Sequence, residues 1–448
     1  MEIVIKLSQF LLSLSLLIVL HELGHFIPAK LFKTRVEKFY LFFDVKFSLL
    51  KKKIGETEYG IGWLPLGGYV KIAGMIDESM DKDQMALPPQ PWEFRSKPAW
   101  QRLIIMLGGV TVNFILAFII YIGMAFVYGD LYIKNNEAKD GIWVANPVVE
   151  ETGLKTGDKI ISVDGFKADR FHELNSKIQL AKTIEVERNG AKQTINLPVN
   201  FVDKLMSGKR ASIIELRIPF VVTSTEDDSQ NKDVVKAKDR IVSFNGQPVK
   251  YADQVLIAVK DLKGKTVPAI IVRDDKEIPV SLKVNDSARM GIVYAVRLPA
   301  NNIQKLGLYN VTKEKYGFAE SFPIGIEKGI EQVKDYGKQL KVIFTPETGA
   351  YKGVGGFYAI FNIFPDQWSW EVFWSITALL SIMLGVMNLL PIPALDGGHV
   401  MFLLYEIITR RKPSDKFMEY AQIAGFVLLI ALVLFANGND IYKAIVGK

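Results

Sequence analysis

The 448-residue sequence contains no cysteine, which excludes disulfide bonds and any chemistry that needs a thiolate, although this absence does not identify a cellular compartment. Charged residues are also scarce, at 23%, whereas 49% of the residues are hydrophobic and the mean hydropathy is positive. This balance is typical of chains in which membrane-spanning segments alternate with soluble parts.

The chain carries a formal net charge of +7. A positive charge can indicate contact with nucleic acid or with anionic lipid, but membrane proteins also collect lysine and arginine in the loops that face the cytoplasm. We therefore attribute the charge to membrane topology and expect no nucleic-acid partner.

Four long apolar runs approach or exceed the ~20 residues that a helix needs to cross the hydrocarbon core of a bilayer. They cover residues 3–28, 103–128, 372–395 and 417–436. The first run lies where a signal peptide would, but it continues into a polar motif and not into a small-residue cleavage site, so we expect it to be retained. The sequence predicts a polytopic α-helical membrane protein with four transmembrane helices.

The distribution of positive charge predicts the orientation of these spans. Lysine and arginine are concentrated between the first two spans and in the short segment between the last two, so both segments should face the cytoplasm. The flanks of residues 129–370 are mixed or acidic, with Asp130, Asp366 and Glu371, so this large region should lie outside the cytoplasm. The first and third spans then run in the same direction.

The large outer region contains an internal repeat. Lys155-Thr-Gly-Asp-Lys-Ile-Ile-Ser-Val-Asp-Gly165 recurs as Lys236-Ala-Lys-Asp-Arg-Ile-Val-Ser-Phe-Asn-Gly246, and each copy reads as a turn, an alternating strand and a second tight turn. The repeat resembles the Gly-Asp-x-Ile-x-x-x-Asn-Gly stretch of PDZ domains and predicts two PDZ-like α+β modules, at 129–215 and 216–300. We find no Gly-Leu-Gly-Phe carboxylate-binding loop, which favours a structural or gating role over ligand binding.

Residues 301–371 have a different pattern. From Asn301 onward the sequence is helical and amphipathic, which predicts a helix that lies at the membrane surface or packs on the PDZ-like modules. The glycine-rich apolar stretch at 353–360 is compatible with a loop that approaches the membrane and equally with an ordinary linker.

The motif His21-Glu-Leu-Gly-His25 lies inside the first apolar run. Residues four apart share one face of a helix, so His21 and His25 can offer two ring nitrogens to one metal ion, and Glu22 can act as general base. A sequence motif as short as this one also arises by chance. Ionisable residues within an apolar span are costly unless they are paired or metal-bound, however, and this favours the functional interpretation.

A catalytic zinc takes three protein ligands and keeps one position for water, so a third ligand must come from elsewhere in the chain. Asp396 is the candidate, within Asn388-Leu-Leu-Pro-Ile-Pro-Ala-Leu-Asp-Gly-Gly-His399. It falls at the inward end of the third span, and His21 and His25 fall near the inward end of the first. Because both spans run the same way, we expect the two motifs to meet at similar depth.

The residues around Asp396 suit a carboxylate that is aimed into a cavity. Pro391 and Pro393 interrupt helical hydrogen bonding, and Gly397 and Gly398 permit the backbone to unwind. The alternative is an ordinary turn, because Asp-Gly is a common turn pair.

The two remaining histidines have other expected roles. Two histidines and one carboxylate already complete a ligand set, so we assign His399 a supporting or structural role near the metal. His172, in the large outer region, is expected to be an ordinary surface residue.

These motifs together resemble the site-2 protease family of intramembrane zinc proteases, in the arrangement of its bacterial regulator of sigma-E protease type. The resemblance covers essentially the whole chain and implies a Zn²⁺ cofactor held by His21, His25 and Asp396, with Glu22 as the catalytic base. It also implies that Asn388 contacts the substrate or stabilises the transition state. A buried amide near zinc can donate a hydrogen bond to a developing oxyanion, and the alternative is a hydrogen bond between helices.

The resemblance further implies the substrates and the location. Family members cleave a transmembrane helix near its cytoplasmic side, usually after another protease has trimmed the outer domain of the substrate. Anti-sigma factors and signal-peptide remnants are the expected substrates, so the partners would be single-pass membrane proteins and the lipid bilayer, with no requirement for an oligomer. The expected location is the bacterial cytoplasmic (inner) membrane, with the PDZ-like modules in the periplasm.

Cleavage requires an extended peptide, because a helix keeps its carbonyl groups in its own hydrogen bonds. Residues 59–72 read as two short strands around a Pro-Leu-Gly-Gly turn and resemble the membrane-associated cytoplasmic β-hairpin of the family, which would pair with an unwound substrate strand. The alternative is a plain interfacial hairpin. The predicted substrate-binding residues are Gly60, Gly62, Gly67, Gly68, Asn388 and Pro391.

Two other functions use some of the same features. A non-catalytic membrane-anchored scaffold would use the PDZ-like pair to bind protein tails. A transporter with broken spans would use the glycine and proline interruptions, but the span pattern has no corresponding second half.

The predicted divisions of the chain follow from these features. They are a first span with the histidine motif (1–30), a cytoplasmic or re-entrant β segment (31–102), a second span (103–128), the PDZ-like modules (129–215 and 216–300), an amphipathic helix and loop (301–371), a third span with the Leu-Asp-Gly motif (372–398), a cytoplasmic loop (399–416), and a fourth span with the C-terminus (417–448).

Overall fold

The structure is a computed structural model that describes residues 2–65, 67–75, 87–167, 169–207, 212–295, 300–305 and 307–446. Part of the predicted Pro-Leu-Gly-Gly turn, at Leu66, and part of the predicted cytoplasmic segment, at 76–86, lie outside these ranges. The chain forms two compact units. Unit 1 comprises Met1–Gly129, Lys315–Lys341 and Val354–Lys448, and unit 2 comprises Asp130–Glu314 and Val342–Gly353.

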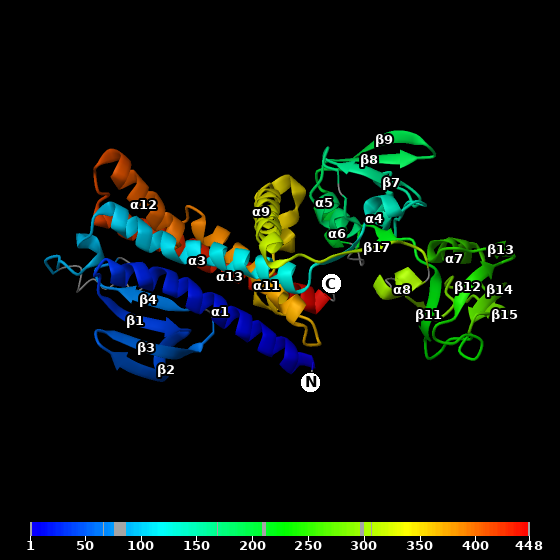
Figure 1. Cartoon of the computed structure of the whole chain (residues 1–448), viewed down its shortest axis with the longest axis horizontal. Coiled ribbons are helices and arrows are strands. Elements are labelled where there is room, and N and C mark those ends of the chain that lie inside the picture. The colour runs from blue at the N-terminus through cyan, green and yellow to red at the C-terminus, as the bar shows by residue number, and fades with distance from the viewer. Residues whose placement is uncertain are drawn as a thin grey trace. The chain divides into compact units, whose positions relative to one another are not determined.

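Unit 1 contains four helices that are long and apolar enough to cross a membrane, as the four apolar runs predict. Helix α3 packs against α1 and α11, and Figure 1 shows these helices side by side. The four helices are α1 (Glu2–Leu31), α3 (Ala99–Val127), α11 (Trp370–Leu389) and α13 (Asp415–Val446).

Glycine permits the close approach of α1 and α3. A Cβ atom on Gly24 would stand 2.6 Å from the carbonyl carbon of Gly108, so a larger side chain would force the two backbones apart. Polar side chains also join the helices. Ser13 and Thr377 share a hydrogen bond of 2.9 Å, and both kinds of contact are typical of helices that pack within a bilayer.

The third apolar helix is shorter than predicted. Helix α11 ends at Leu389, so the predicted end of the span at 398 is wrong. Part of the segment predicted as a cytoplasmic loop at 399–416 forms helix α12 (Asp396–Thr409), and its cytoplasmic side stays a prediction. The break follows from Pro391 and Pro393, which cannot donate helical hydrogen bonds. Once the prolines are passed, the chain is free to begin a new helix at Asp396.

The two glycines after Asp396 serve close packing and do not unwind the backbone. Gly397 and Gly398 lie in the first turn of α12. A Cβ on Gly398 would stand 2.6 Å from the carbonyl oxygen of Ile392 and from Cα of Pro393, so the loop can fold back on this turn only if the residue is glycine.

A four-stranded sheet lies along α1 in unit 1, and its order is β2-β3-β1-β4 (Figure 1). Strand β3 pairs with β1 in parallel and β4 pairs with β1 antiparallel, so β3 and β4 flank β1 on opposite sides. The predicted hairpin across 59–72 is therefore wrong, because β1 provides the partner edge for both strands. The strands are β1 (Val36–Leu41), β2 (Phe43–Ile54), β3 (Thr57–Leu64) and β4 (Tyr69–Ile72).

The hairpin of this sheet joins β2 and β3. Its turn contains Gly55 at φ +62°, a left-handed backbone conformation that glycine adopts without strain. Strand β4 is left with only one partner and forms an open edge of the described sheet.

Unit 2 contains two modules, each with its own apolar core. The first contains β5 (Asp130–Ile133), β6 (Ile142–Trp143), α4 (Pro147–Glu150), β7 (Lys159–Val163), α5 (Leu174–Gln179), β8 (Thr183–Arg188), β9 (Ala191–Asn196), α6 (Phe201–Ser207) and β10 (Glu215–Leu216). The second contains β11 (Phe220–Thr225), β12 (Arg240–Phe244), β13 (Gln247–Pro248), α7 (Ala252–Ala258), β14 (Thr266–Arg273), β15 (Lys276–Lys283) and β16 (Ile292–Tyr294).

The sequence repeat has the same structure in both modules. In each copy an aspartate before the strand pairs with an arginine at the end of a later strand: Asp158 with Arg188, at 2.6 Å, and Asp239 with Arg273, at 2.8 Å. Both aspartates are buried. The strands β7 and β12 are followed by the predicted turns, whose central residues have positive φ. The assignment of these modules to the PDZ fold stays a prediction.

The region after the second module is only partly helical. It begins with α8 (Ala300–Lys305) and β17 (Val311–Glu314), which pairs with β5 in unit 2. The predicted amphipathic helix is α9 (Phe318–Ile343), and its buried Gly325 and Gly329 lie against α3. The glycine-rich stretch leads into α10 (Phe357–Asn362), where the backbone N–H of Gly356 donates to the carboxylate of Asp440 on α13.

Candidate metal centre

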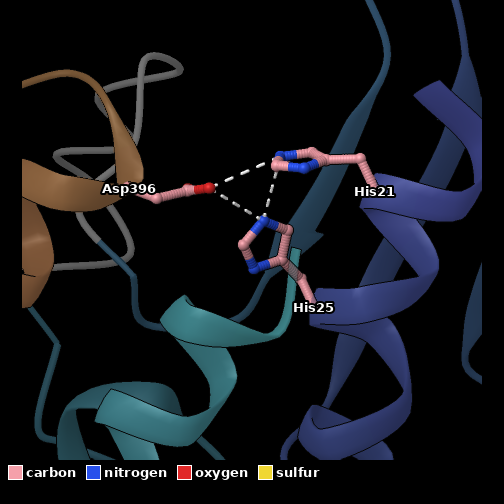
Figure 2. Close-up of side chains that lie close together, drawn as sticks. All are labelled: His21, His25 and Asp396. Carbon is pink, nitrogen blue, oxygen red and sulfur yellow. Dashed lines mark hydrogen bonds and ion pairs between the residues drawn. The ribbon is translucent and has the colours of Figure 1, made fainter. Parts of the chain in front are cut away.

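Three side chains from distant parts of the chain converge in unit 1. His21 and His25 lie four residues apart on α1, and Asp396 is the first residue of α12. Figure 2 shows the two imidazole rings and the carboxylate pointing toward one another. Oδ2 of Asp396 lies 3.4 Å from Nε2 of His21 and 3.3 Å from Nε2 of His25, and the two Nε2 atoms are 3.3 Å apart.

This triangle fits a tetrahedral zinc site. Zinc binds histidine nitrogen and carboxylate oxygen at about 2.0–2.2 Å, and the edges of a tetrahedron with such bonds measure about 3.3–3.6 Å. Both histidines are buried, and Oδ2 of Asp396 is a buried atom with no hydrogen-bond partner in the described residues. A metal ion would satisfy this oxygen, and the two rings and the carboxylate would form one face of its coordination shell.

Asp396 lies beside the two histidines, as expected if the first and third spans run in the same direction and hold both motifs at similar depth. The three residues are the only group in the described part of the chain that brings together three or more histidine, cysteine or acidic side chains at metal-ligand spacing. Their assignment as the zinc ligands stays a prediction.

Glu22 lies beside the three converging side chains and lines the same cavity of about 510 Å³. Its carboxylate accepts a hydrogen bond from the backbone N–H of Val70 on β4. Strand β4 has no partner on its other edge in the described sheet. Residues of β4 and of the loop before Asp396 both line the cavity.

Asn388 and Pro391, both predicted to bind substrate, have different surroundings. Nδ2 of Asn388, at the end of α11, lies 3.3 Å from Nε2 of His21, so this amide is close enough to contact a group bound at the metal. Pro391 is exposed and does not line the cavity, and its observed role is to end α11.

The four glycines predicted to keep the β segment accessible are explained mainly by packing. A Cβ on Gly67 would touch the ring of Phe43 at 3.0 Å. A Cβ on Gly60 would collide with the side chain of Tyr40 on β1, and one on Gly62 would collide with the backbone at the start of β2. Gly68 lines the cavity, and its Cβ would stand 3.4 Å from Cγ of Glu22. Gly68 is thus the glycine of this set that lies nearest to the candidate chemistry.

Of the other two histidines, His399 also lines the cavity, in keeping with a supporting role near the metal. His172 is exposed in unit 2, as expected for a surface residue.

Polar side chains of the β segment also line the cavity. Lys38 approaches Asp44 at 3.6 Å, and the hydroxyl of Tyr69 donates a hydrogen bond of 2.8 Å to the same carboxylate. Burial opposes the charged form of Asp44, but the hydrogen bond from Tyr69 and the ammonium group of Lys38 keep its pKa below the ordinary value. Asp44 is therefore ionised at neutral pH and fixes the orientation of both neighbours.

Sequence reasoning missed the contribution of α3. Nδ1 of His25 lies 2.8 Å from the carbonyl oxygen of Ile105, and Nδ1 of His21 lies 3.0 Å from the side-chain amide of Asn113. Gly109 stands between them and leaves space for both rings. Ile105, Gly109 and Asn113 are each four residues apart and share one face of α3. The sequence feature that could have indicated this contribution is Asn113, the only amide side chain in the second predicted span.

Comparison with known proteins gives consistent matches over nearly the whole chain. The model of peptidase family M50 matches residues 9–432. A Campylobacter jejuni protein named "putative zinc metalloprotease" is 28% identical, over 98% of this chain and 94% of its own length. A Clostridium perfringens protein with the same description is 28% identical over 96% and 97%, and the regulator of sigma-E protease RseP of Escherichia coli is 27% identical over 97% and 98%.

Proposed function

The chain belongs to peptidase family M50 and is a zinc metalloprotease, and on this premise we propose that it hydrolyses peptide bonds within the membrane-spanning segments of other proteins. One observation carries the proposal: His21, His25 and Asp396 converge at zinc-ligand spacing, on and beside helices that are long and apolar enough to cross a bilayer. The cavity beside them is bounded by residues of unit 1. A non-catalytic scaffold would have no use for this arrangement.

Different residues of the chain have different roles in hydrolysis. His21, His25 and Asp396 would hold the zinc, which when bound polarises a carbonyl group and lowers the pKa of water toward ~7. Glu22, with its carboxylate in the cavity, takes a proton from the attacking water and passes it to the nitrogen of the leaving amine. Asn388 can donate a hydrogen bond to the oxyanion that develops at the scissile carbonyl.

The open edge of β4 is the proposed binding site for an extended substrate strand. An unwound transmembrane segment would add to this edge by backbone hydrogen bonds, which present its carbonyl groups to the cavity. The hydrogen bond between Val70 and Glu22 supports this proposal, because it places the edge of β4 next to the general base.

We further propose that the substrates are single-pass membrane proteins whose outer domains another protease has already removed. The name of the Escherichia coli relative, a regulator of sigma-E, supports anti-sigma factors as one substrate class, and signal-peptide remnants are a second. The bacterial inner membrane is the proposed location. The positive charge beside the spans supports a periplasmic side for unit 2.

Cleavage of a tagged single-pass reporter in proteoliposomes tests the proposal. The variant Glu22→Gln should keep its zinc and lose about 10²–10⁴-fold in cleavage rate, the usual contribution of a general base. Asp396→Asn should lose zinc and cleavage together. Glu56→Gln makes the same chemical change at an exposed position in the β2–β3 turn and should cleave normally. Undiminished cleavage by Glu22→Gln would refute the proposed mechanism.

A further inference from the structure

Asn113 is fully buried on α3 and faces one imidazole of the candidate metal site. Its exposure is 0%, and its side-chain amide lies 3.0 Å from Nδ1 of His21. Its Oδ1 is a buried atom with no hydrogen-bond partner in the described residues. A fully buried amide whose one side-chain hydrogen bond within the described residues is to a ring nitrogen calls for an explanation beyond helix packing.

The geometry of the site determines which nitrogen of His21 must be free of hydrogen. Nε2 of His21 faces Nε2 of His25 and Oδ2 of Asp396, so Nε2 is the atom that would bind the metal. A neutral imidazole that binds a metal through Nε2 carries its hydrogen on Nδ1. Nδ1 of His21 then becomes a buried donor and needs an acceptor.

The amide of Asn113 can supply that acceptor. Rotation of the amide by half a turn exchanges Oδ1 and Nδ2 with almost no change in heavy-atom positions. With Oδ1 toward the ring, Nδ1–H of His21 donates to Asn113, and Nδ2 takes the position that has no hydrogen-bond partner in the described residues. This hydrogen bond gives the buried Nδ1–H of His21 its acceptor.

His25 provides an internal comparison. Its Nδ1 lies 2.8 Å from the backbone carbonyl of Ile105, an acceptor that no side-chain substitution removes. Asn113 lies two helical turns further along the same face of α3. Its side chain would accept a hydrogen bond from Nδ1 of His21, as the carbonyl of Ile105 would from Nδ1 of His25. Partners of this kind fix the tautomer and orientation of a metal-binding histidine.

We propose that Asn113 is a positioning residue for the zinc site, which accepts the Nδ1 hydrogen of His21 and so keeps Nε2 available for the metal. This inference rests on the proposed zinc site. Loss of the acceptor favours the tautomer with hydrogen on Nε2, in which Nε2 cannot bind the metal, and leaves Nδ1–H unpaired in the other tautomer. The consequence is weaker zinc binding, whether or not a substrate is present.

The test measures zinc affinity of the full-length protein in detergent, by competition with a chelator of known affinity. Asn113→Leu keeps the approximate volume of the side chain and removes the acceptor, and Asn113→Ala serves as a second variant without one. Asn113→Asp keeps an acceptor in the same place. The matched control is Ser381→Ala, which removes a buried 2.7 Å hydrogen bond from α11 to the backbone carbonyl of Asn113 and leaves the amide in place.

We expect Asn113→Leu and Asn113→Ala to bind zinc about 10–100-fold more weakly, whereas Asn113→Asp stays within about threefold of the parent. Ser381→Ala should bind zinc like the parent. The inference is overturned if Asn113→Leu binds zinc normally, or if Asn113→Asp and Ser381→Ala lose as much affinity as Asn113→Leu, since that would indicate a role in helix packing alone. If the parent itself binds no zinc, the proposed metal site fails and takes this inference with it.

Discussion

Substitution of Gly109 by alanine is a sharp test of the metal centre, because the change is a single methyl group outside the proposed ligands. A Cβ at this position would stand 2.7 Å from Cε1 and 2.9 Å from Nδ1 of His21, and closer still to Nε2 of His25. Ordinary contacts begin near 3.4 Å, so the ring of His21 would have to withdraw by about 0.7 Å and that of His25 further.

Zinc sites tolerate far less displacement. Ligand distances in functional sites hold to within about 0.2 Å, so a shift several times larger should weaken binding. We expect Gly109→Ala to lose at least the 10–100-fold in zinc affinity that disturbed outer partners cost, or about 1.4–2.7 kcal/mol, with a parallel loss of cleavage. Zinc per protein after dialysis against a metal buffer measures the first effect, and cleavage of the tagged reporter measures the second.

Gly123→Ala is the matched control on the same helix. Outside its chain neighbours and the backbone of its own helix, no atom of the described residues lies within 4 Å of the position that its Cβ would take. This variant therefore has the same gain in helix propensity, up to about 1 kcal/mol, without the contact. It should keep its zinc and its activity. If Gly109→Ala keeps both as well, the rings are not packed against α3 as described, and the account of the site's outer partners is refuted.

Other predictions concern the sheet and the soluble modules. Val70→Pro removes the N–H at the open edge of β4 and should reduce cleavage with zinc content unchanged, whereas Val70→Ala keeps that N–H and should cleave faster than the proline variant. Arg273→Ala leaves the carboxylate of Asp239 buried without its partner and should destabilise the second module by about 3 kcal/mol. Faster hydrogen exchange of the backbone amides in β12 would measure this effect. The control, Arg188→Ala, changes the first module and should leave exchange in β12 unchanged. Burial opposes ionisation of Asp239, but the hydrogen bond from Arg273 keeps its pKa below the ordinary value. The pair's contribution to stability should therefore be complete above the pKa of an unfolded aspartate, ~3.9, and lost as pH falls through the lower folded pKa.

Packing against α1 is what makes α3 part of the metal centre. Gly24 and Gly108 bring the two backbones together, and this close approach places the Ile105 carbonyl and the Asn113 amide within hydrogen-bond distance of the imidazoles. A larger residue at either glycine would separate the helices and remove both contacts at once. The same glycines that let the helices pack therefore also determine how the histidines are held.

The sequence by itself determined the features that depend on local pattern. Apolar runs of sufficient length predicted the four long helices, because a bilayer requires that length whatever the tertiary structure. The spacing of His21 and His25 placed both on one helical face, and the direction of the spans predicted that Asp396 would meet them. Pro391 and Pro393 also indicated the break after the third span, since proline cannot continue the helical hydrogen bonds.

Only the tertiary structure decided which segments became neighbours. Strand propensity identified β3 and β4 but could not show that both pair with β1, because the sequence of a strand does not identify the strand with which it pairs. Nor could it reveal that α12 begins at Asp396, which is settled by the fit of Gly397 and Gly398 under the preceding loop. Asn113 was visible in the sequence as a lone amide in an apolar run, yet its contact with His21 depends on how α1 and α3 cross, and that crossing is a property of packed surfaces.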